Sequence, residues 1–266
     1  MKRSIEDTPI VFIGAGNLAT NLAKAFYHKG FRIVQVYSRS IESARALAVA
    51  VEAEFTTDLQ EIVLNAKLYI VSLTDSAFVE LLPQIAVGKE GALMVHTAGS
   101  IPMDVWEGTT SHYGVLYPMQ TFSKQRETSF EEVPFFIEAH LPEDGEFLKK
   151  IASILSKRVY EATSEQRQSL HLAAVFTCNF TNHMYALAAE LLNKSHLPFD
   201  VMLPLIDETA CKVHLLEPKA AQTGPAMRYD ENVINKHLAM LSDEPQAQEL
   251  YSLISKNIHW FQTKGE

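Results

Sequence analysis

The chain has 266 residues, a formal net charge of −9 at pH 7 and two cysteines. This length accommodates one large domain or two moderate ones. An acidic chain is poorly suited to nucleic acids or anionic membranes, so we expect neither as a main partner. Cys178 and Cys211 lie in apolar, helix-like segments, which predicts reduced, buried thiols in a cytoplasmic protein. We expect no membrane span and no signal peptide, because long apolar runs and an h-region are missing.

Near the start of the chain, an apolar strand that includes Val11 ends in a glycine-rich turn and leads into a helical pattern. The turn reads Gly14-x-Gly16-x-x-Ala19, which is typical of dinucleotide-binding domains, although such turns also occur for packing alone. Gly14 permits the tight turn, Gly16 lets the backbone approach a pyrophosphate, and Ala19 allows close packing. The helix N-terminus would face the phosphates. The predicted phosphate-binding residues are Gly14, Ala15, Gly16, Asn17 and Leu18.

The next predicted strand, residues 31–37, leads into Ser38, Arg39 and Ser40. An NAD site usually has an acidic residue here for the ribose hydroxyls, and Glu42 comes too late in the sequence. A guanidinium flanked by two hydroxyls suits a 2′-phosphate, because it offers charge-assisted, bidentate donors. We therefore predict NADP as the cofactor and consider NAD less suitable. The alternative is a solvated arginine in a turn.

Strands continue to alternate with helices to about residue 160. Further strands are predicted over residues 67–73, 92–97, 114–118, 133–139 and 158–162, with helices after Thr74 and over residues 143–155. This alternation predicts a mainly parallel sheet with ligands beyond the carboxyl ends of its strands. Residues expected around that crevice are Ser72, Leu73, Thr74 and Thr97 for the cofactor, together with His96, Gly99, Tyr117 and Gln120.

After residue 164 the pattern is helical only. Residues 165–193 carry apolar side chains on nearly every face, which predicts one long buried helix. Shorter helices are predicted over residues 198–216, 231–241 and 245–261. We predict a dinucleotide-binding domain over residues 1–163 and a helical substrate and dimerisation domain over residues 164–266. This second domain is small for a core of its own, so we expect a homodimer joined through it.

These motifs together resemble a known family. They are Gly14-Ala15-Gly16-Asn17, His96-Thr97-Ala98-Gly99-Ser100, Tyr117-Pro118-Met119-Gln120-Thr121-Phe122, His171-Leu172-Ala173-Ala174-Val175-Phe176 with Asn179, and Thr223-Gly224-Pro225-Ala226-Met227-Arg228-Tyr229-Asp230. The N-terminal half is similar to the dinucleotide domains of pyrroline-5-carboxylate reductases, β-hydroxyacid dehydrogenases and NADP-linked F420 oxidoreductases. Nearly the whole chain resembles the family with a Rossmann-like domain followed by a DUF2520 domain.

The resemblance implies an α/β fold in which a Rossmann-type, mainly parallel sheet domain precedes an all-α domain of the 6-phosphogluconate-dehydrogenase C-terminal type. It also implies a nicotinamide-binding dimer. Two positions depart from the family pattern. Tyr117 stands where a His is expected before the Pro, and Tyr229 stands where a Gly is expected between Arg228 and Asp230.

Polar groups on the long helix are candidates for completing a site. Projected at about 100° per residue, His171 shares a face with Cys178 and Asn182, and Asn179 lies about 80° away. We predict that His171 donates a proton and Asn179 orients the substrate, with His96 the second choice as donor. Alternatively, His171 and Asn179 bond to backbone or to a partner subunit. Substrate-binding candidates are Tyr117, Gln120, Gly224, Pro225 and Arg228, although Arg228 could instead pair with Asp230.

The type of reaction is suggested by what is missing. β-Hydroxyacid dehydrogenases of this architecture use a lysine on the long helix, and residues 165–193 contain none, with Lys194 following them. Reduction of an imine asks mainly for hydride delivery and orientation. We therefore predict an NADP(H)-dependent oxidoreductase that reduces a small C=N or C=O substrate, like a pyrroline-5-carboxylate reductase. The alternative is a non-catalytic, NADP-binding dimeric sensor or interaction protein. No metal site is expected, because the ten histidines lack ligand spacing.

Overall fold

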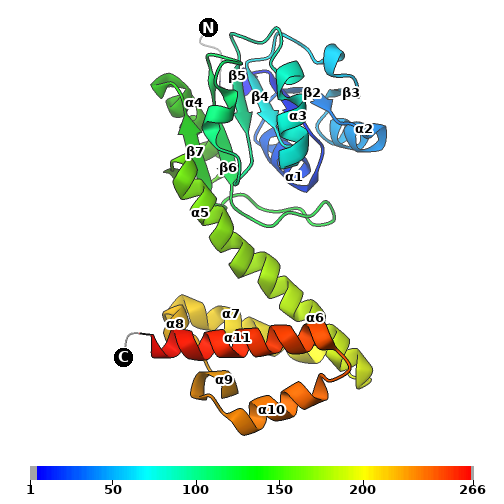
Figure 1. Cartoon of the computed structure of the whole chain (residues 1–266). Coiled ribbons are helices and arrows are strands. Elements are labelled where there is room, and N and C mark those ends of the chain that lie inside the picture. The colour runs from blue at the N-terminus through cyan, green and yellow to red at the C-terminus, as the bar shows by residue number, and fades with distance from the viewer. Residues whose placement is uncertain (1–4, 265–266) are drawn as a thin grey trace. The chain divides into compact units, whose positions relative to one another are not determined.

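The computed structural model describes residues 5–264 and divides into two compact units, Met1–Asn179 and Phe180–Glu266. The first unit is built on an eight-stranded sheet, and the second is made of helices (Figure 1). The predicted boundary at residue 163, which separates a cofactor-binding domain from a substrate and dimerisation domain, stays a prediction.

The sheet has the strand order β3-β2-β1-β4-β5-β6-β7-β8. Only the β6–β7 pair is antiparallel, and the other six pairs are parallel. The order 3-2-1-4-5-6 is that of a Rossmann fold, with its switch point between β1 and β4. This confirms the predicted fold class. The strands are β1 Ile10–Ile13, β2 Ile33–Tyr37, β3 Glu54–Thr56, β4 Leu68–Val71, β5 Leu93–His96, β6 Tyr113–Pro118, β7 Phe135–Ala139 and β8 Val159–Glu161.

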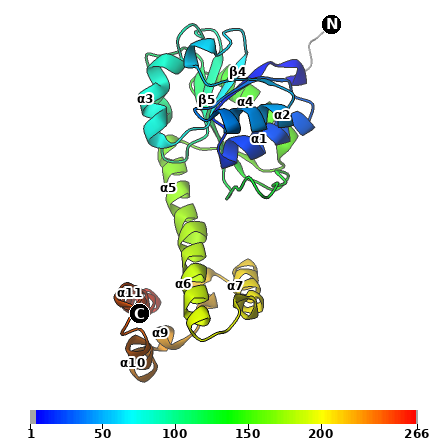
Figure 2. The same cartoon turned by 90° about the vertical axis from the view of Figure 1, so that its right-hand side faces the viewer.

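Helices cover both faces of the sheet (Figure 2). Alternate residues of a strand point to opposite faces. Phe12 therefore belongs to the core cluster that includes residues of α1, α2 and α4, whereas Val11 belongs to the cluster on the other face, with residues of α3 and the buried ring of Trp106. These helices are α1 Asn17–His28, α2 Ile41–Ala50, α3 Asp75–Ile85 and α4 Pro142–Leu155, and short 3-10 turns lie at Ile5–Asp7, Leu59–Glu61 and Met103–Trp106. The sequence patterns did not predict β3 or α2.

The long helix predicted over residues 165–193 consists of three segments. They are α5 Ser164–Ala174, a π-helical segment Val175–Phe180 and α6 Thr181–Lys194. A capping box begins α5, because the Thr163 side chain accepts from the Gln166 N–H and the Gln166 side chain accepts from the Thr163 N–H. The predicted burial is wrong for the single chain, where Leu172 is 60% exposed. An all-round apolar pattern does not distinguish burial within a chain from burial against another one.

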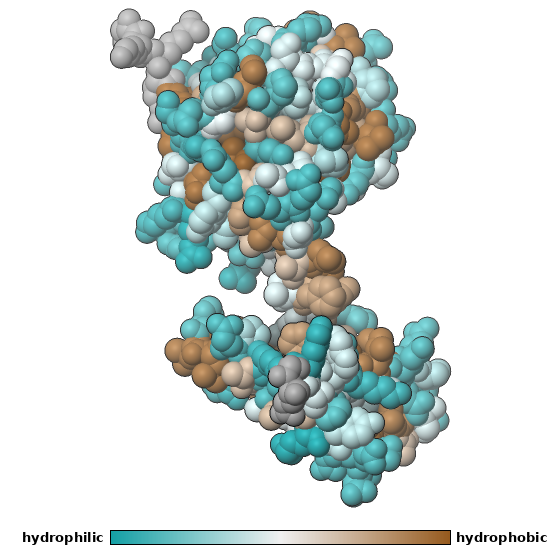
Figure 3. Space-filling view, turned by 60° about the vertical axis from the view of Figure 1, so that its left-hand side comes forward, coloured by the Kyte–Doolittle hydropathy of each residue, from teal (hydrophilic) through white to brown (hydrophobic). Residues whose placement is uncertain are grey.

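The second unit has few buried side chains. Its elements after α6 are a 3-10 turn Phe199–Met202, α7 Leu203–Leu215, α8 Pro218–Ala221, α9 Pro225–Arg228, α10 Glu231–Met240 and α11 Pro245–Thr263. Ala226, Ile234 and Leu241 are its buried hydrophobic residues, whereas Leu215 and Met240 are exposed. Brown, hydrophobic patches accordingly interrupt its surface (Figure 3).

The two cysteines differ in exposure, and neither forms a disulfide. Cys211 on α7 is exposed, so the prediction that it is a buried thiol is wrong, while Cys178 is half-buried and both cysteines are free. The apolar pattern correctly indicated a helix around Cys211, but it did not indicate burial, because this helix lies at the surface of its unit. Within residues 5–264, no helix combines the length and apolar character that crossing a bilayer requires.

Candidate functional site

The turn after β1 has a backbone that only glycine fits at one position. Gly14 has φ +116°, and a Cβ built on it would lie 2.1 Å from the carbonyl oxygen of Ser72. Its N–H donates to the Tyr37 carbonyl at 2.8 Å, which ties the turn to the end of β2. A side chain here would collide with backbone from β4, so Gly14 allows β1 and β4 to pass closely.

Gly16 has a different role. A Cβ on this residue would meet nothing within 4 Å, so the space beside it is open. Gly16 is the N-cap of α1 without a side-chain cap, and the first turn of α1 has no acidic residue. The open backbone at Gly16, with the uncapped N–H groups and the positive end of the helix dipole in the same turn, fits a pyrophosphate. The exposed Asn17 and half-buried Leu18 begin the helix at this point.

The residues after β2 form the start of α2. Ser40 is its N-cap: the hydroxyl accepts from the Ser43 N–H at 3.3 Å and donates to the Glu42 carboxylate at 2.7 Å. This hydrogen bond lowers the pKa of Glu42. Arg39 is exposed and, within residues 5–264, forms no ion pair, while Ser38 is half-buried. The free guanidinium and the helix N-terminus fit a 2′-phosphate.

The carboxyl ends of β4 and β5 lie beside the phosphate-binding turn. The Ser72 carbonyl limits the space at Gly14, and a Leu73 methyl lies 3.3 Å from the same built Cβ. Thr74 is the N-cap of α3 without using its side chain. Thr97 is buried, and its N–H donates to the Val71 carbonyl at 3.2 Å. The predicted cofactor-binding residues of β1, β2, β4 and β5 thus follow neighbouring strands at one edge of the sheet.

His96 lies inside the first unit. It is 1% exposed and packs edge-on against Phe78 and parallel to Trp106. Its Nδ1 accepts from the Ala98 N–H at 3.2 Å, which leaves the ring proton on Nε2. Burial lowers the pKa of His96 to about 3, with the Arg167 charge a smaller cause. His96 is therefore neutral at physiological pH and supports the turn after β5. Its role as a proton donor stays a prediction.

Tyr117 and His171 form a pair at the carboxyl end of β6. The Tyr117 hydroxyl lies 3.3 Å from Nδ1 of His171, and the two rings meet edge to face. The His171 ring lies so close to Gly99 that a Cβ there would come within 2.7 Å of it. Burial raises the pKa of Tyr117, so its hydroxyl keeps the proton at neutral pH and can donate it to Nδ1. In the tautomer that accepts this bond, the N–H of His171 is on Nε2.

An ion pair between Arg167 and Glu138 anchors α5, the helix that carries His171. The sequence patterns did not identify it. Arg167 is 1% exposed, and its Nη1 donates to the Glu138 carboxylate at 2.5 Å. The same guanidinium donates to the carbonyls of Ala98, at 3.2 Å, and Ile101. Arg167 thus fixes the β5 turn to the helix that carries His171. An arginine one turn before a histidine gave no sequence signal, because polar residues at helix starts are common.

Two other predicted site residues of the first unit, Asn179 and Gln120, are exposed. Asn179 is exposed in the π-helical segment, which departs from the 100° spacing used to project it, so its predicted face does not hold. Gln120 is exposed, and its side-chain oxygen accepts from the Thr121 N–H at 2.8 Å. Their roles toward a substrate stay predictions.

The remaining predicted residues belong to the second unit. Gly224 has φ +103° and is the N-cap of α9, which begins at Pro225. Arg228 is exposed and does not pair with Asp230, whose carboxylate instead caps α10 by accepting from the Val233 N–H. Tyr229 has φ +52°, a left-handed conformation. This explains why glycine is the expected residue at that position.

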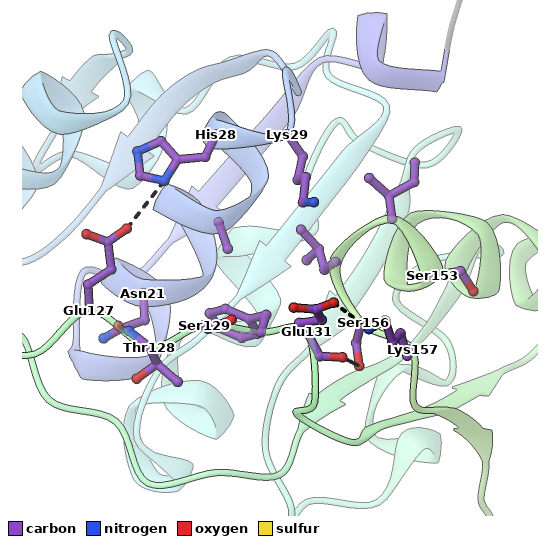
Figure 4. A pocket seen from close by; sticks show the side chains of 14 residues that line it. Asn21, His28, Lys29, Glu127, Thr128, Ser129, Glu131, Ser153, Ser156 and Lys157 are labelled. Atoms are coloured by element: carbon purple, nitrogen blue, oxygen red, sulfur yellow. Dashed lines mark hydrogen bonds and ion pairs between the residues drawn. The ribbon is translucent and has the colours of Figure 1, made fainter.

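A surface hollow of about 460 Å³ lies at the other end of α1, away from Gly16 (Figure 4). Its charged side chains are paired across it, since His28 contacts Glu127 at 3.3 Å and Lys157 contacts Glu131 at 2.5 Å. These pairs neutralise most of its charges, with Lys29 the lining cation outside them, and the hollow contains none of the predicted site residues. We assign no role in the reaction to it.

Comparisons with known proteins agree with this geometry. Residues 9–99 match the family model "NADP oxidoreductase coenzyme F420-dependent", and residues 133–258 match the domain of unknown function DUF2520. A crystallised Bacteroides fragilis protein, described as a candidate NADP oxidoreductase, is 76% identical, with a TM-score of 0.94 over 96% of this chain and 99% of that one. A search of curated proteins finds no match.

More distant structures share the fold. A Thermotoga maritima protein is 21% identical, with a TM-score of 0.68 over 95% of this chain and 98% of its own. The imine reductase of Myxococcus stipitatus in complex with NADP+ is 15% identical, with a TM-score of 0.69 over 97% of this chain and 95% of its own. The chain belongs to the family that joins an N-terminal domain of the NADP oxidoreductase, coenzyme F420-dependent, type to a DUF2520 domain.

Proposed function

We propose that this protein, an NADP-dependent oxidoreductase by its family, reduces a small C=N or C=O substrate in the manner of an imine or pyrroline-5-carboxylate reductase. The observation that carries the proposal is the Tyr117–His171 pair, with its 3.3 Å contact, at the carboxyl end of β6. Ligands of this fold bind at that edge of the sheet.

The cofactor would be held by residues at three strand ends. The open backbone at Gly16 and the α1 N-terminus fit the pyrophosphate, and Arg39 fits the 2′-phosphate. When bound, NADPH supplies the hydride. The protein's task is then to bind and orient the substrate, exclude water and provide a proton or hydrogen bond.

In this proposal His171 is the donor. With Tyr117 donating to Nδ1, the Nε2–H of His171 is free to donate to the nitrogen or oxygen that receives negative charge. Tyr117 fixes the ring orientation and the tautomer. His171 is only half-buried, so a substrate can reach it.

The substrate class follows from the proton chemistry. The helical segments α5 and α6 contain Lys194 alone among lysines, at the last position of α6, so no lysine is placed near His171 along the chain. An imine nitrogen is more basic than a ketone oxygen, so the weakly acidic imidazole N–H of His171 protonates it more readily during hydride transfer. This favours C=N reduction. The imine reductase of M. stipitatus shares the fold and is a precedent for that reaction on it.

Matched variants at the two ends of β6 test the catalytic pair. NADPH oxidation would be followed with cyclic imines and small ketones. We expect His171→Gln to lower kcat by about 100-fold or more, the scale of general acid catalysis, and Tyr117→Phe to lower it less. Tyr113 stacks on His140 at the start of β6, with ring centroids 4.5 Å apart. The control variants Tyr113→Phe and His140→Gln should keep wild-type kcat. Equal losses in both pairs would contradict the assignment.

We also propose that the protein is a homodimer joined through its helical half. The support is the exposure of large apolar side chains there, including Leu215 at 85% and Met240 at 80%. Patches of this kind mark interfaces. Light scattering at micromolar concentration should give a dimer, weakened in Leu215→Asp/Met240→Asp. The control Val49→Asp/Val79→Asp alters exposed apolar residues of the first unit and should stay dimeric. A wild-type monomer would contradict the proposal.

A further inference from the structure

The segment between β6 and β7 contains a tight turn that one buried side chain holds in place. Asn21 on α1 is 5% exposed; its amide donates to the Ser123 carbonyl at 2.9 Å, and its side-chain oxygen accepts from the Thr128 N–H at 3.1 Å. Ser123 and Arg126 bridge the turn between these two points. The same Asn21 amide also bonds to the carbonyl of Asn17, the first residue of α1. The turn is thereby tied to the phosphate-binding end of that helix.

The tip of this turn carries Lys124 to the start of α2. The Lys124 ammonium donates to the Ser43 hydroxyl at 3.4 Å. Ser43 also gives its N–H to Ser40, the N-cap of α2, and Arg39 directly precedes that cap. Residues far apart in the sequence thus place two cations within about one helical turn of the same helix N-terminus.

The charges around these cations suggest an anion. Within residues 5–264, neither Lys124 nor Arg39 forms an ion pair, although the chain carries a net charge of −9. The same first turn of α2 carries the Glu42 carboxylate, which accepts from the Ser40 hydroxyl, and this hydrogen bond lowers its pKa and keeps it charged. A single arginine on a turn that also carries a carboxylate gives little net attraction for a dianion. The second cation makes the site positive.

We propose that Lys124 is a second determinant of cofactor choice, which binds the 2′-phosphate of NADP(H) together with Arg39 and the Ser43 hydroxyl. This inference rests on the proposed function, because it needs NADP(H) in the dinucleotide site. The guanidinium offers paired donors to phosphate oxygens, and the ammonium acts as a compact charge from the other side. Lys124 then exchanges its bond to Ser43 for one shared with the phosphate.

Calorimetry with adenosine 2′,5′-bisphosphate and adenosine 5′-monophosphate tests this without catalysis. We expect Lys124→Ala to weaken binding of the bisphosphate about tenfold, the scale of one charge-assisted hydrogen bond, and to leave the monophosphate unaffected. Lys124→Arg should restore most of the affinity. The matched control is Arg126→Ala, which removes an exposed cation from the same turn and should bind both nucleotides like the wild type.

The possible failures can be distinguished. If the wild type binds NADPH no better than NADH, the NADP assignment itself fails. If the wild type prefers NADPH and Arg39→Ala removes the preference while Lys124→Ala keeps it, only the role of Lys124 fails. Equal losses in Lys124→Ala and Arg126→Ala would show an unspecific effect of surface charge and would also overturn the proposal. Loss in Lys124→Ala for the bisphosphate alone supports it.

Discussion

Two alanine substitutions in the turn after β1 should have opposite consequences. Gly14→Ala places a Cβ 2.1 Å from the Ser72 carbonyl oxygen and forces alanine to φ +116°. A backbone conformation reserved for glycine costs about 1–3 kcal/mol, and overpacking costs about 1–3 kcal/mol more. We therefore expect the first unit to lose roughly 2–6 kcal/mol of unfolding free energy. Gly16→Ala meets nothing within 4 Å at φ −75°, so its stability should stay within about 0.5 kcal/mol of the wild type.

The same pair separates stability from cofactor binding. Gly16→Ala fills the space that we assign to the pyrophosphate, so it should weaken NADPH binding by more than tenfold in a fully folded protein. Of the two tryptophans, Trp106 is buried in the first unit and Trp260 is about half-exposed in the second. Urea unfolding of Trp260→Phe variants, followed by fluorescence, would therefore report on the first unit. A Gly14→Ala variant as stable as its parent, or a Gly16→Ala variant with normal NADPH affinity, would refute this reasoning.

Substitutions at three further residues test the packing. Because the folded-state pKa of His96 is lowered to about 3, its stabilising contribution is complete above pH 6.5 and declines as the pH falls toward 3. The unfolding free energy of the wild type relative to His96→Asn should thus drop by about 2 kcal/mol between pH 6.5 and 5 in urea titrations, and a constant difference would contradict this. Arg167→Ala removes a buried guanidinium from Glu138 and from the carbonyls of Ala98 and Ile101, and it should cost about 3–5 kcal/mol by the same assay. A loss below about 1 kcal/mol would argue against the anchor. Tyr229→Asn relieves a left-handed tyrosine and should raise the melting temperature of the second unit, whereas Tyr229→Phe, which keeps the strain and the ring contact with His259, should leave it unchanged. No rise in Tyr229→Asn would contradict this.

The parts of the fold set by local patterns were predictable. The turn at Gly14 and Gly16, the buried strands and their alternation with helices give a parallel sheet, because each signal acts within a few residues. β3 has exposed Glu54 and Phe55 and only three residues, so it carried no such signal. The family pattern has Gly where this chain has Tyr229. The backbone there is left-handed, with φ +52°, which is the conformation that glycine adopts without strain.

The candidate site was less predictable, because it depends on contacts between distant residues. His171 was identified from its place in an apolar helix, but its contact with Tyr117 depends on where α5 docks, which Arg167 decides. A projection at constant spacing could not place Asn179, since the π-helical segment changes the rotation per residue. Lys124 has no motif, and only the folding of its turn over α1 brings it to Ser43.

The most direct measurement of the central claim is NADPH oxidation by the purified protein with cyclic imines and small ketones, alongside NADH. We expect reduction of a cyclic imine with a preference for NADPH; this activity should be lost in His171→Gln and kept in His140→Gln. Two results would contradict the proposed function. One is a protein that binds NADPH but reduces none of these imines and ketones, and the other is a His171→Gln variant with the activity of the wild type.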